Sequence, residues 1–417
     1  MGLISQRNTK MFARLGGRGF SNSPSPTEVG VSASPDQNTW EIPILAGFSF
    51  SQTTNSTEVT VNEAGFISRR SRVMYNDSLA PVEFSVSTYI RPTQSTTPNK
   101  VSAPEQVLWA MLMGADGYAA TGGRFYNTLG IGSPSPATAP NATNAINSGN
   151  TTSNADTFDF SASNYSYYPA GNSIIFQVRE GATYKTFEIR DAQIGSVTID
   201  FDIEGIATAQ WSGMGTSIVE GATEITGANN FGVNLTDNFI RNKLSTLVIS
   251  SYLDADTASP GAAAGSPGTD TYDITITGGS FTVENNFNFL IPEELGKVNQ
   301  TVGNITGTRS ISGSLTCYYD TTVSASKSAE LWTDLLNGNS GSPTVDTALP
   351  DIRNAHNITI NIGGDRGARL IIRMPAAHLE IPTINPDELY SLEVNYHAMP
   401  TSGNFDLTNE ATVTYAV

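Results

Sequence analysis

Cysteine and histidine are scarce in this chain of 417 residues, which contains one cysteine and three histidines. The single cysteine, Cys317, excludes an intramolecular disulfide framework. Because it lies in the alternating apolar and polar run 311–319, we expect a small buried side chain and not a reactive thiol. The histidines lack the close spacing of a zinc motif, so the sequence predicts no metal site; they are His356, His378 and His397.

Long apolar runs are also missing. No stretch approaches the roughly 18 residues that a membrane helix needs, and residues 1–19 lack the apolar core of a signal peptide. The sequence contains no phosphate-binding loop, no dinucleotide fingerprint and no nucleophile elbow. It therefore predicts no membrane anchor, no cofactor and no catalytic residues, and it fits a protein that is made and assembled in a cytoplasm.

Positive charge is the third scarcity: 22 Lys and Arg stand against 39 Asp and Glu, a formal charge of −17. An acidic body repels phosphate, which argues against specific binding of nucleic acid. Four bases nevertheless precede the first acid, Glu28, and the run RRSR at 69–72 holds three more. We expect these bases to pair with carboxylates of a neighbouring subunit; they are Arg7, Lys10, Arg14, Arg18, Arg69, Arg70 and Arg72.

Short β-strands account for most of what is present. With 38% hydrophobic residues the chain is too apolar for disorder, and these residues often alternate with polar ones. Val82, Phe84 and Val86 follow this pattern, as do the runs 197–204 and 392–397. Such alternation is typical of strands with one buried face. Helices are expected only at 104–113 and 328–336, so the sequence predicts a mainly β protein.

The order strand, strand, helix, hairpin, strand occurs twice, and each expected helix carries a Leu-Trp pair, at 108–109 and 331–332. We interpret this order as a duplication. Residues 130–164 are a low-complexity run without periodicity and are expected to form a surface loop. The expected divisions are an extended N-terminal arm 1–40, a first β domain 41–220 with that insertion, a connecting segment 221–269 and a second β domain 270–417.

An acidic cluster is the most suggestive candidate for chemistry. Alternation should place Asp200, Asp202 and Glu204 on one face of a strand and Ile199, Phe201 and Ile203 on the other. Paired carboxylates can hydrolyse glycosides and can bind Ca²⁺. No partner residues for hydrolysis are identifiable, and ligands along a flat strand do not form a cage. A solvated strand face is therefore the favoured interpretation.

Three segments are similar to a known family. The closing run RLIIRMPAAHLEIPTINPDELYSLEVNYHAMP (369–400) resembles the C-terminal strands of bacteriophage tail tube proteins. QIGSVTIDFDIEGIATAQWSGMG (193–215) looks like another strand pattern of that family, and 61–92 resembles its N-terminal strands. The resemblance implies two tandem domains, each a β-sandwich or half-barrel with a short flanking α-helix.

The same resemblance implies a function. In that family, inner strands of successive subunits join into a β-barrel ring, and stacked rings form the conduit for phage DNA in the virion tail, together with other tail proteins. Two domains in one chain imply a trimer with pseudo-sixfold symmetry, with a hexamer as the alternative. An acidic bore would let DNA pass without specific binding, and the candidates for facing it are Asp200, Asp202, Glu204 and Glu393.

Two other functions remain open at this point. A glycan-binding adhesin would need clustered exposed aromatic residues, and Tyr165, Tyr167 and Tyr168 are the one such cluster. A capsid or decoration protein of a virion is the other alternative. For a tube subunit, we expect deletion of residues 1–38 to leave a folded body but to impair the stacking of rings.

Overall fold

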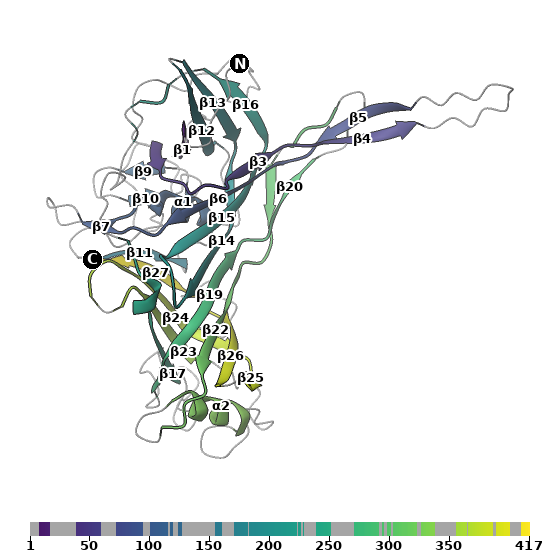
Figure 1. Ribbon diagram of the computed structural model, residues 1–417. Helices are drawn as coiled ribbons and strands as arrows, with labels where there is room; N and C mark the ends of the chain where they lie inside the picture. The colour runs from purple at the N-terminus through teal and green to yellow at the C-terminus, as the bar shows by residue number, and fades with distance from the viewer. Residues whose placement is uncertain are drawn as a thin grey trace, which may run out of the picture.

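The chain folds into two packed antiparallel sheets from which a long hairpin projects, as the computed structural model in Figure 1 shows. The prediction of a mainly β protein is confirmed. The structure describes residues 8–16, 39–59, 72–94, 101–115, 117–119, 124–126, 155–160, 171–181, 183–222, 224–226, 228, 239–251, 271–291, 294–295, 298–301, 303–322, 327–337, 356–364, 366–386, 389–400 and 410–417.

The larger sheet crosses the whole molecule. Buried and exposed side chains alternate along its strands, so each strand buries one row of side chains, for example Val82, Phe84 and Val86. In spatial order its strands are β18 (Thr271–Ile274), β17 (Thr246–Ser251), β23 (His356–Ile362), β24 (Arg369–Leu379), β26 (Tyr390–Ala398), β22 (Ser310–Tyr318), β19 (Ile276–Glu284), β14 (Gln193–Asp202), β15 (Thr208–Gly215), β6 (Val82–Tyr89) and β3 (Ser49–Ser51). Three further strands belong to this sheet. β25 (Thr383–Pro386) pairs with β26, β27 (Thr412–Ala416) pairs with β24, and β11 (Ala155–Asp159) pairs with β27.

The smaller sheet packs against the β3 end of the larger one. The ring of Phe50 on β3 stacks on that of Phe176 on β12, with centroids 4.9 Å apart, so the core of this half lies between the two sheets. In spatial order the smaller sheet contains β16 (Ser217–Gly221), β13 (Thr183–Arg190), β12 (Ser173–Glu180), β1 (Thr9–Arg14) and β2 (Thr39–Ile42).

Paired short strands, two α-helices and one short 3₁₀ helix complete the described fold. The projecting hairpin in Figure 1 is β4 (Thr54–Val59) with β5 (Val73–Leu79). The other two-stranded pairs are β7 (Thr93–Gln94) with β8 (Val101–Ser102), β9 (Gly117–Ala119) with β10 (Arg124–Tyr126), and β20 (Phe287–Leu290) with β21 (Gly303–Thr306). The helices are α1 (Gln106–Leu112), α2 (Ser328–Asn337) and the short 3₁₀ helix η4 (Asn242–Leu244). Both α-helices lie where the sequence predicted them.

One strand links the two layers of the C-terminal half. The first part of β24 pairs with β23 and β27, and its last residues, Ala377 to Leu379, pair with β26. The corresponding stretch of the N-terminal half is β13 and the start of β14, which are separated at Asp191 with a φ of 50°. The left-handed conformation of Asp191 breaks the strand there.

The strands of the N-terminal half and those of the C-terminal half follow each other along the chain in the same order. They also pair with one another in the same order, so the two halves form two similar runs of elements. The first run has β16-β13-β12-β1-β2 as one row and β14-β15-β6-β3 as the other. The second has β27-β24-β23-β17-β18, and then β25-β26-β22-β19. In both runs a hairpin, β4–β5 or β20–β21, precedes the strand that leads to the α-helix.

This arrangement corrects the expected segment boundaries. Thr9–Arg14 was expected in an extended arm, but β1 pairs along its whole length with β12. Thr246–Ser251 was expected in a connecting segment, but β17 pairs with β18 and β23. Both strands bury apolar side chains, including Met11 and Leu247. Each also pairs with a strand more than 100 residues later in the sequence, and a short sequence window does not show such a pairing.

The prediction of a surface loop at 130–164 is wrong for the C-terminal end of that segment. Residues 155–159 form β11, which pairs with β27 near the other end of the chain. Phe158 and Phe160 are buried in the core. Residues 130–154 and 161–164 lie outside the described part of the chain.

Candidate functional site: a polar sheet face and its open edges

One face of the larger sheet is polar across many strands. On β14, Ser196, Thr198 and Asp200 point away from the buried Val197 and Ile199. Strand pairing places these residues beside polar ones on both neighbours: Ser212, Gln210 and Thr208 on β15, and Glu284, Thr282 and Ser280 on β19. The pattern continues across β6, β22 and β26, so a continuous hydrophilic surface covers the outside of the core.

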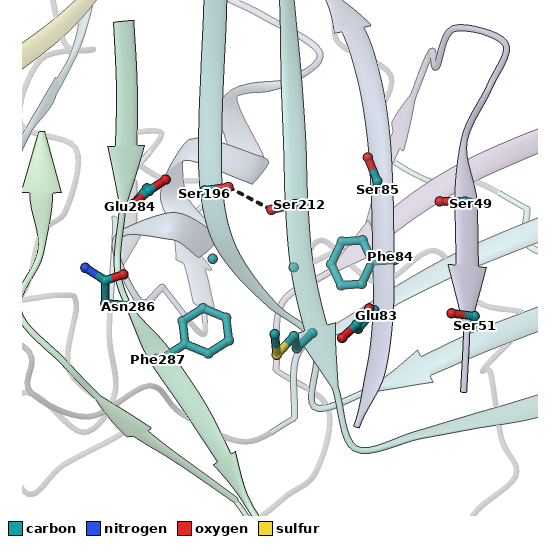
Figure 2. Close-up of a pocket in the computed structure, with 13 residues that line it drawn as sticks. Ser49, Ser51, Glu83, Phe84, Ser85, Ser196, Ser212, Glu284, Asn286 and Phe287 are labelled. Carbon is teal, nitrogen blue, oxygen red and sulfur yellow. Dashed lines mark hydrogen bonds between the residues drawn. The ribbon is translucent and has the colours of Figure 1, made fainter. Parts of the chain in front are cut away.

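Hydroxyl groups join neighbouring strands on this face. The hydroxyls of Ser196 and Ser212 lie 2.7 Å apart, as Figure 2 shows. Those of Thr198 and Thr282 lie 3.2 Å apart and link β14 to β19. Such bonds satisfy the side chains within the sheet. The surface is therefore polar but offers few long side chains to a molecule that passes over it.

The charge of this face is negative. Within β3, β6, β15, β14, β19, β22 and β26, each of which the structure describes in full, there is no Lys or Arg. The same strands carry five exposed carboxylates, on Glu83, Asp200, Asp202, Glu284 and Glu393. Fixed carboxylates without cations repel a polyanion.

The sequence-predicted acids are partly brought together. Asp202, Gly278, Thr316 and Glu393 form one row across β14, β19, β22 and β26. Asp202 and Glu393 therefore share a face, although 191 residues separate them in the sequence. Asp200 lies on the same face, one row away.

Glu204 does not share the strand face of Asp200 and Asp202, so the prediction that all three lie on one face of a strand was wrong. The strand β14 ends at Asp202, and residues 203–205 form a bend with Gly205 at a φ of 114°. Alternation stops there, which leaves Ile203 with 46% of its surface exposed where a buried side chain was expected. Glycine adopts this left-handed conformation without the strain of a side chain.

The sequence interpretation missed Glu83 and Glu284. They lie at opposite sides of a hollow, as Figure 2 shows. Its volume is about 530 Å³, and its lining includes Ser51 of β3 and Phe287 of β20. Phe84 also lines this hollow. The alternation of Glu83 with Val82 and Phe84 carried the signal, but nothing in the local sequence shows which strands adjoin β6.

The predicted inter-subunit bases have partners in their own chain where they are described. Lys10 pairs with Glu41 at 2.9 Å, which joins β1 to β2. Arg72 pairs with Glu58 at 3.2 Å, at the outer end of the described part of the projecting hairpin. Arg14 is the last residue of the same strand, four positions after Lys10. The other four candidates, Arg7, Arg18, Arg69 and Arg70, lie outside the described residues.

Cys317 is buried on β22, as expected. Burial raises the pKa of its thiol to about 11, against a smaller opposing effect of the Ser328 hydroxyl. A thiol with this pKa is not a reactive nucleophile near neutral pH. The tyrosines considered for glycan binding, Tyr165, Tyr167 and Tyr168, lie outside the described residues.

The larger sheet ends in open strand edges. Among the described residues no strand pairs with the outer edge of β3 or with the outer edge of β25. Large apolar side chains lie exposed close to β25, with exposed fractions of 58% for Ile381, 65% for Leu389 and 57% for Tyr390. Unpaired edges next to exposed apolar groups are sites where further chains add.

A polar, acidic sheet face with open edges fits a structural protein whose strands can pair with further chains. The family model for phage tail tube proteins matches residues 29–398. The chain is also similar to the tail tube protein pb6 of Escherichia phage T5, at 30% identity over 374 residues, which span 87% of this chain and 68% of that protein.

This chain belongs to the phage tail tube protein family. It is a structural subunit of a phage tail tube and a component of the virion tail, as the sequence resemblance implied. The alternatives of a glycan-binding adhesin and of a capsid or decoration protein are not favoured by these relationships. None of the described helices is both long and apolar enough to span a membrane.

Proposed function

We propose that the chain contains two tube modules, residues 9–221 and 246–417, and that three chains close a ring of six modules around phage DNA. The support is the shared order of pairing in the two runs of strands. In this scheme β14 and β25 are corresponding strands, and so are β19 and β3. A ring of six copies, each contributing two modules, is the alternative and would be twice as large.

The junction between the modules carries the proposal. Inside the chain, β14 of the first module pairs with β19 of the second over the stretch from Ser196 to Asp202. The corresponding strands at the two ends of the chain, β25 and β3, have open outer edges in the described structure. The same junction formed between chains would pair β25 of one copy with β3 of the next and would leave no open edge.

The register of this proposed contact follows from strand pairing within each module. Ser49 lies opposite Ser85 in the first module as Ser280 lies opposite Ser314 in the second. Thr383 and Asn385 take the places that Thr198 and Asp200 hold in the first module. Since Asp200 lies opposite Ser280 and Thr198 opposite Thr282, we expect Asn385 to face Ser49 of the next chain and Thr383 to face Ser51.

In such a ring the polar face would line the bore. The carboxylates of Glu83, Asp200, Asp202, Glu284 and Glu393 would then repeat around the axis without a Lys or Arg among the described bore strands. DNA condenses cations and binds strongly to basic surfaces. An acidic wall of short hydroxyl side chains would let it move without being held, and no catalytic step is needed.

A cross-linking experiment tests the contact and the register together. The double variant Ser49→Cys with Asn385→Cys should form disulfides between chains in assembled rings, because directly opposed residues of antiparallel strands lie within the Cα distance of a disulfide. Denaturing electrophoresis should show a covalent trimer, or a hexamer for the alternative ring. The matched control, Ser85→Cys with Asn385→Cys, should remain monomeric.

The same experiment can refute the proposal. Cross-linking that stops at dimers would contradict a closed ring, and efficient cross-linking of the control would contradict the register. Electron microscopy of the unmodified protein provides the independent check, because the proposed ring requires threefold symmetry with six similar lobes.

A further inference from the structure

All three histidines of the chain meet at one place in the sheet. His356 opens β23, His378 lies on β24 and His397 lies on β26, which are consecutive strands of the larger sheet. His378 and His397 are directly opposite one another in the antiparallel pair of β24 and β26. Their side chains therefore share one face, with Cβ atoms about 4.5–5.5 Å apart.

Both members of this pair are exposed and so do not serve the core. A carboxylate stands beside them: the Oε1 atom of Glu380 lies 3.7 Å from Nε2 of His397. The other oxygen, Oε2, accepts a hydrogen bond of 3.0 Å from the Nδ2 amide of Asn395, which holds the carboxylate in place. Two imidazoles and one oriented carboxylate thus lie together on an open surface.

We propose that His378 and His397 form a two-imidazole clamp for a divalent transition metal ion, with Glu380 supplying charge and an oxygen ligand. Imidazole nitrogen is a good ligand for Ni²⁺, Cu²⁺ and Zn²⁺. Among the described residues no three His, Cys, Asp or Glu side chains, these three included, are placed to hold a metal ion in their present conformations. The clamp would therefore form by rotation of exposed side chains and would leave coordination positions for water.

His356 provides a comparison within the same cluster. It lies opposite Ala377, one position from His378, and so on the other face of the sheet. Burial, and secondarily the nearness of His378, lowers the pKa of His356 to about 4. This imidazole is neutral but enclosed, and it is not part of the proposed clamp.

Metal titration of the full-length protein tests the clamp. With Ni²⁺ in a buffer free of imidazole, calorimetry should show one site per chain. His378→Gln and His397→Gln should each weaken this binding at least about tenfold, and Glu380→Gln less. His356→Gln is the matched control and should bind as the unmodified protein does.

A spectroscopic measurement identifies the ligands directly. With one equivalent of Cu²⁺, electron paramagnetic resonance should show nitrogen couplings from two imidazoles in the unmodified protein and from one in either single variant. The proposal fails if the unmodified protein binds no metal, if the double variant binds as well as the unmodified protein, or if His356→Gln abolishes binding.

Discussion

The two α-helices begin from similar sequences and end in different environments. Each carries a Leu-Trp pair, but every residue of α1 is buried, whereas α2 exposes Glu330, Thr333 and Leu336. Trp109 of α1 contacts Trp211, with ring centroids 5.0 Å apart, and donates a hydrogen bond of 2.7 Å to the hydroxyl of Tyr415 on β27. Trp332 of α2 is half-buried and contacts Tyr319.

The difference shows that the elements packed around each helix, and not the sequence of the helix, decide how much that helix stabilises the fold. Strand β11 leads into Phe160, whose ring meets Trp109 edge-on, and β27 brings Tyr415 to the same tryptophan. Both strands thereby cover α1. Figure 1 shows α2 instead at the outer end of the molecule. A helix that is covered on all sides belongs to the core, and one covered on a single side remains a surface element.

The largest expected effect comes from removing the buried tryptophan. Trp109→Ala should lower the free energy of unfolding by about 3–5 kcal/mol, because it leaves a cavity between α1 and β15. Trp332→Ala should cost about 1–2 kcal/mol, since part of that ring is already in water. Urea denaturation of unassembled protein measures both. Equal losses for the two variants would contradict the contrast between the helices.

The two helices also differ in that a buried carboxylate, that of Glu105, lies just before α1. Oε1 of Glu105 accepts a hydrogen bond of 3.2 Å from the Arg91 amide. Burial raises the pKa of Glu105 from 4.5 to about 7, against smaller opposing effects of backbone amides, the Tyr415 hydroxyl and the Arg91 charge. Because the folded-state pKa lies above the unfolded one, the contribution of Glu105 to stability is most favourable below pH 4.5 and is lost as the pH rises through about 7.

Replacing the carboxyl of Glu105 tests how the environments of the two helices affect the pH dependence of stability. Glu105→Gln should be neutral below pH 4.5 and should stabilise the fold above pH 7 by up to about 3 kcal/mol, because the amide cannot ionise. Denaturation curves at pH 4, 6 and 8 provide the measurement. A constant difference between variant and unmodified protein across this range would show that ionisation of Glu105 has no part in it. Glu330→Gln on the exposed α2 is the matched control and should show no comparable pH dependence.

The smallest of these effects concerns one hydroxyl group. Tyr415→Phe keeps the ring but removes the hydroxyl that accepts from the indole of Trp109 and also bonds the carboxyl of Glu105, which should cost about 1–2 kcal/mol. Tyr390→Phe, on the exposed part of β26, should change stability by less than about 0.5 kcal/mol. Thermal unfolding under identical conditions would decide; similar shifts for both variants would mean that the bond to Trp109 contributes nothing measurable.

Local patterns predicted the elements of this fold better than their connections. Alternation identified β6, β14 and β26, and the Leu-Trp runs identified both helices, because burial of one face leaves a periodic trace in a short window. The strands β1, β11 and β17 were missed. They are short, they adjoin low-complexity or basic segments, and their partners lie far away in sequence.

The candidate site was predictable to the same degree. Asp200, Asp202 and Glu393 could be found from alternation on their own strands, and Glu83 could have been added by the same rule. Glu204 was misplaced because a bend ends the strand two residues earlier. The opposition of His378 and His397 left no trace in the sequence, since residues that face each other across strands have no fixed spacing along the chain.

The hydrogen bond between Trp109 and Tyr415 also sets an order of events during synthesis. The two residues are 306 positions apart, so a ribosome adding about 5–20 residues per second needs roughly 15–60 s to supply the second after the first. Throughout that interval the pocket around α1 lacks its last strand. A nascent chain therefore cannot complete its N-terminal half before Tyr415 has been synthesised, which delays competence for polymerisation until that point.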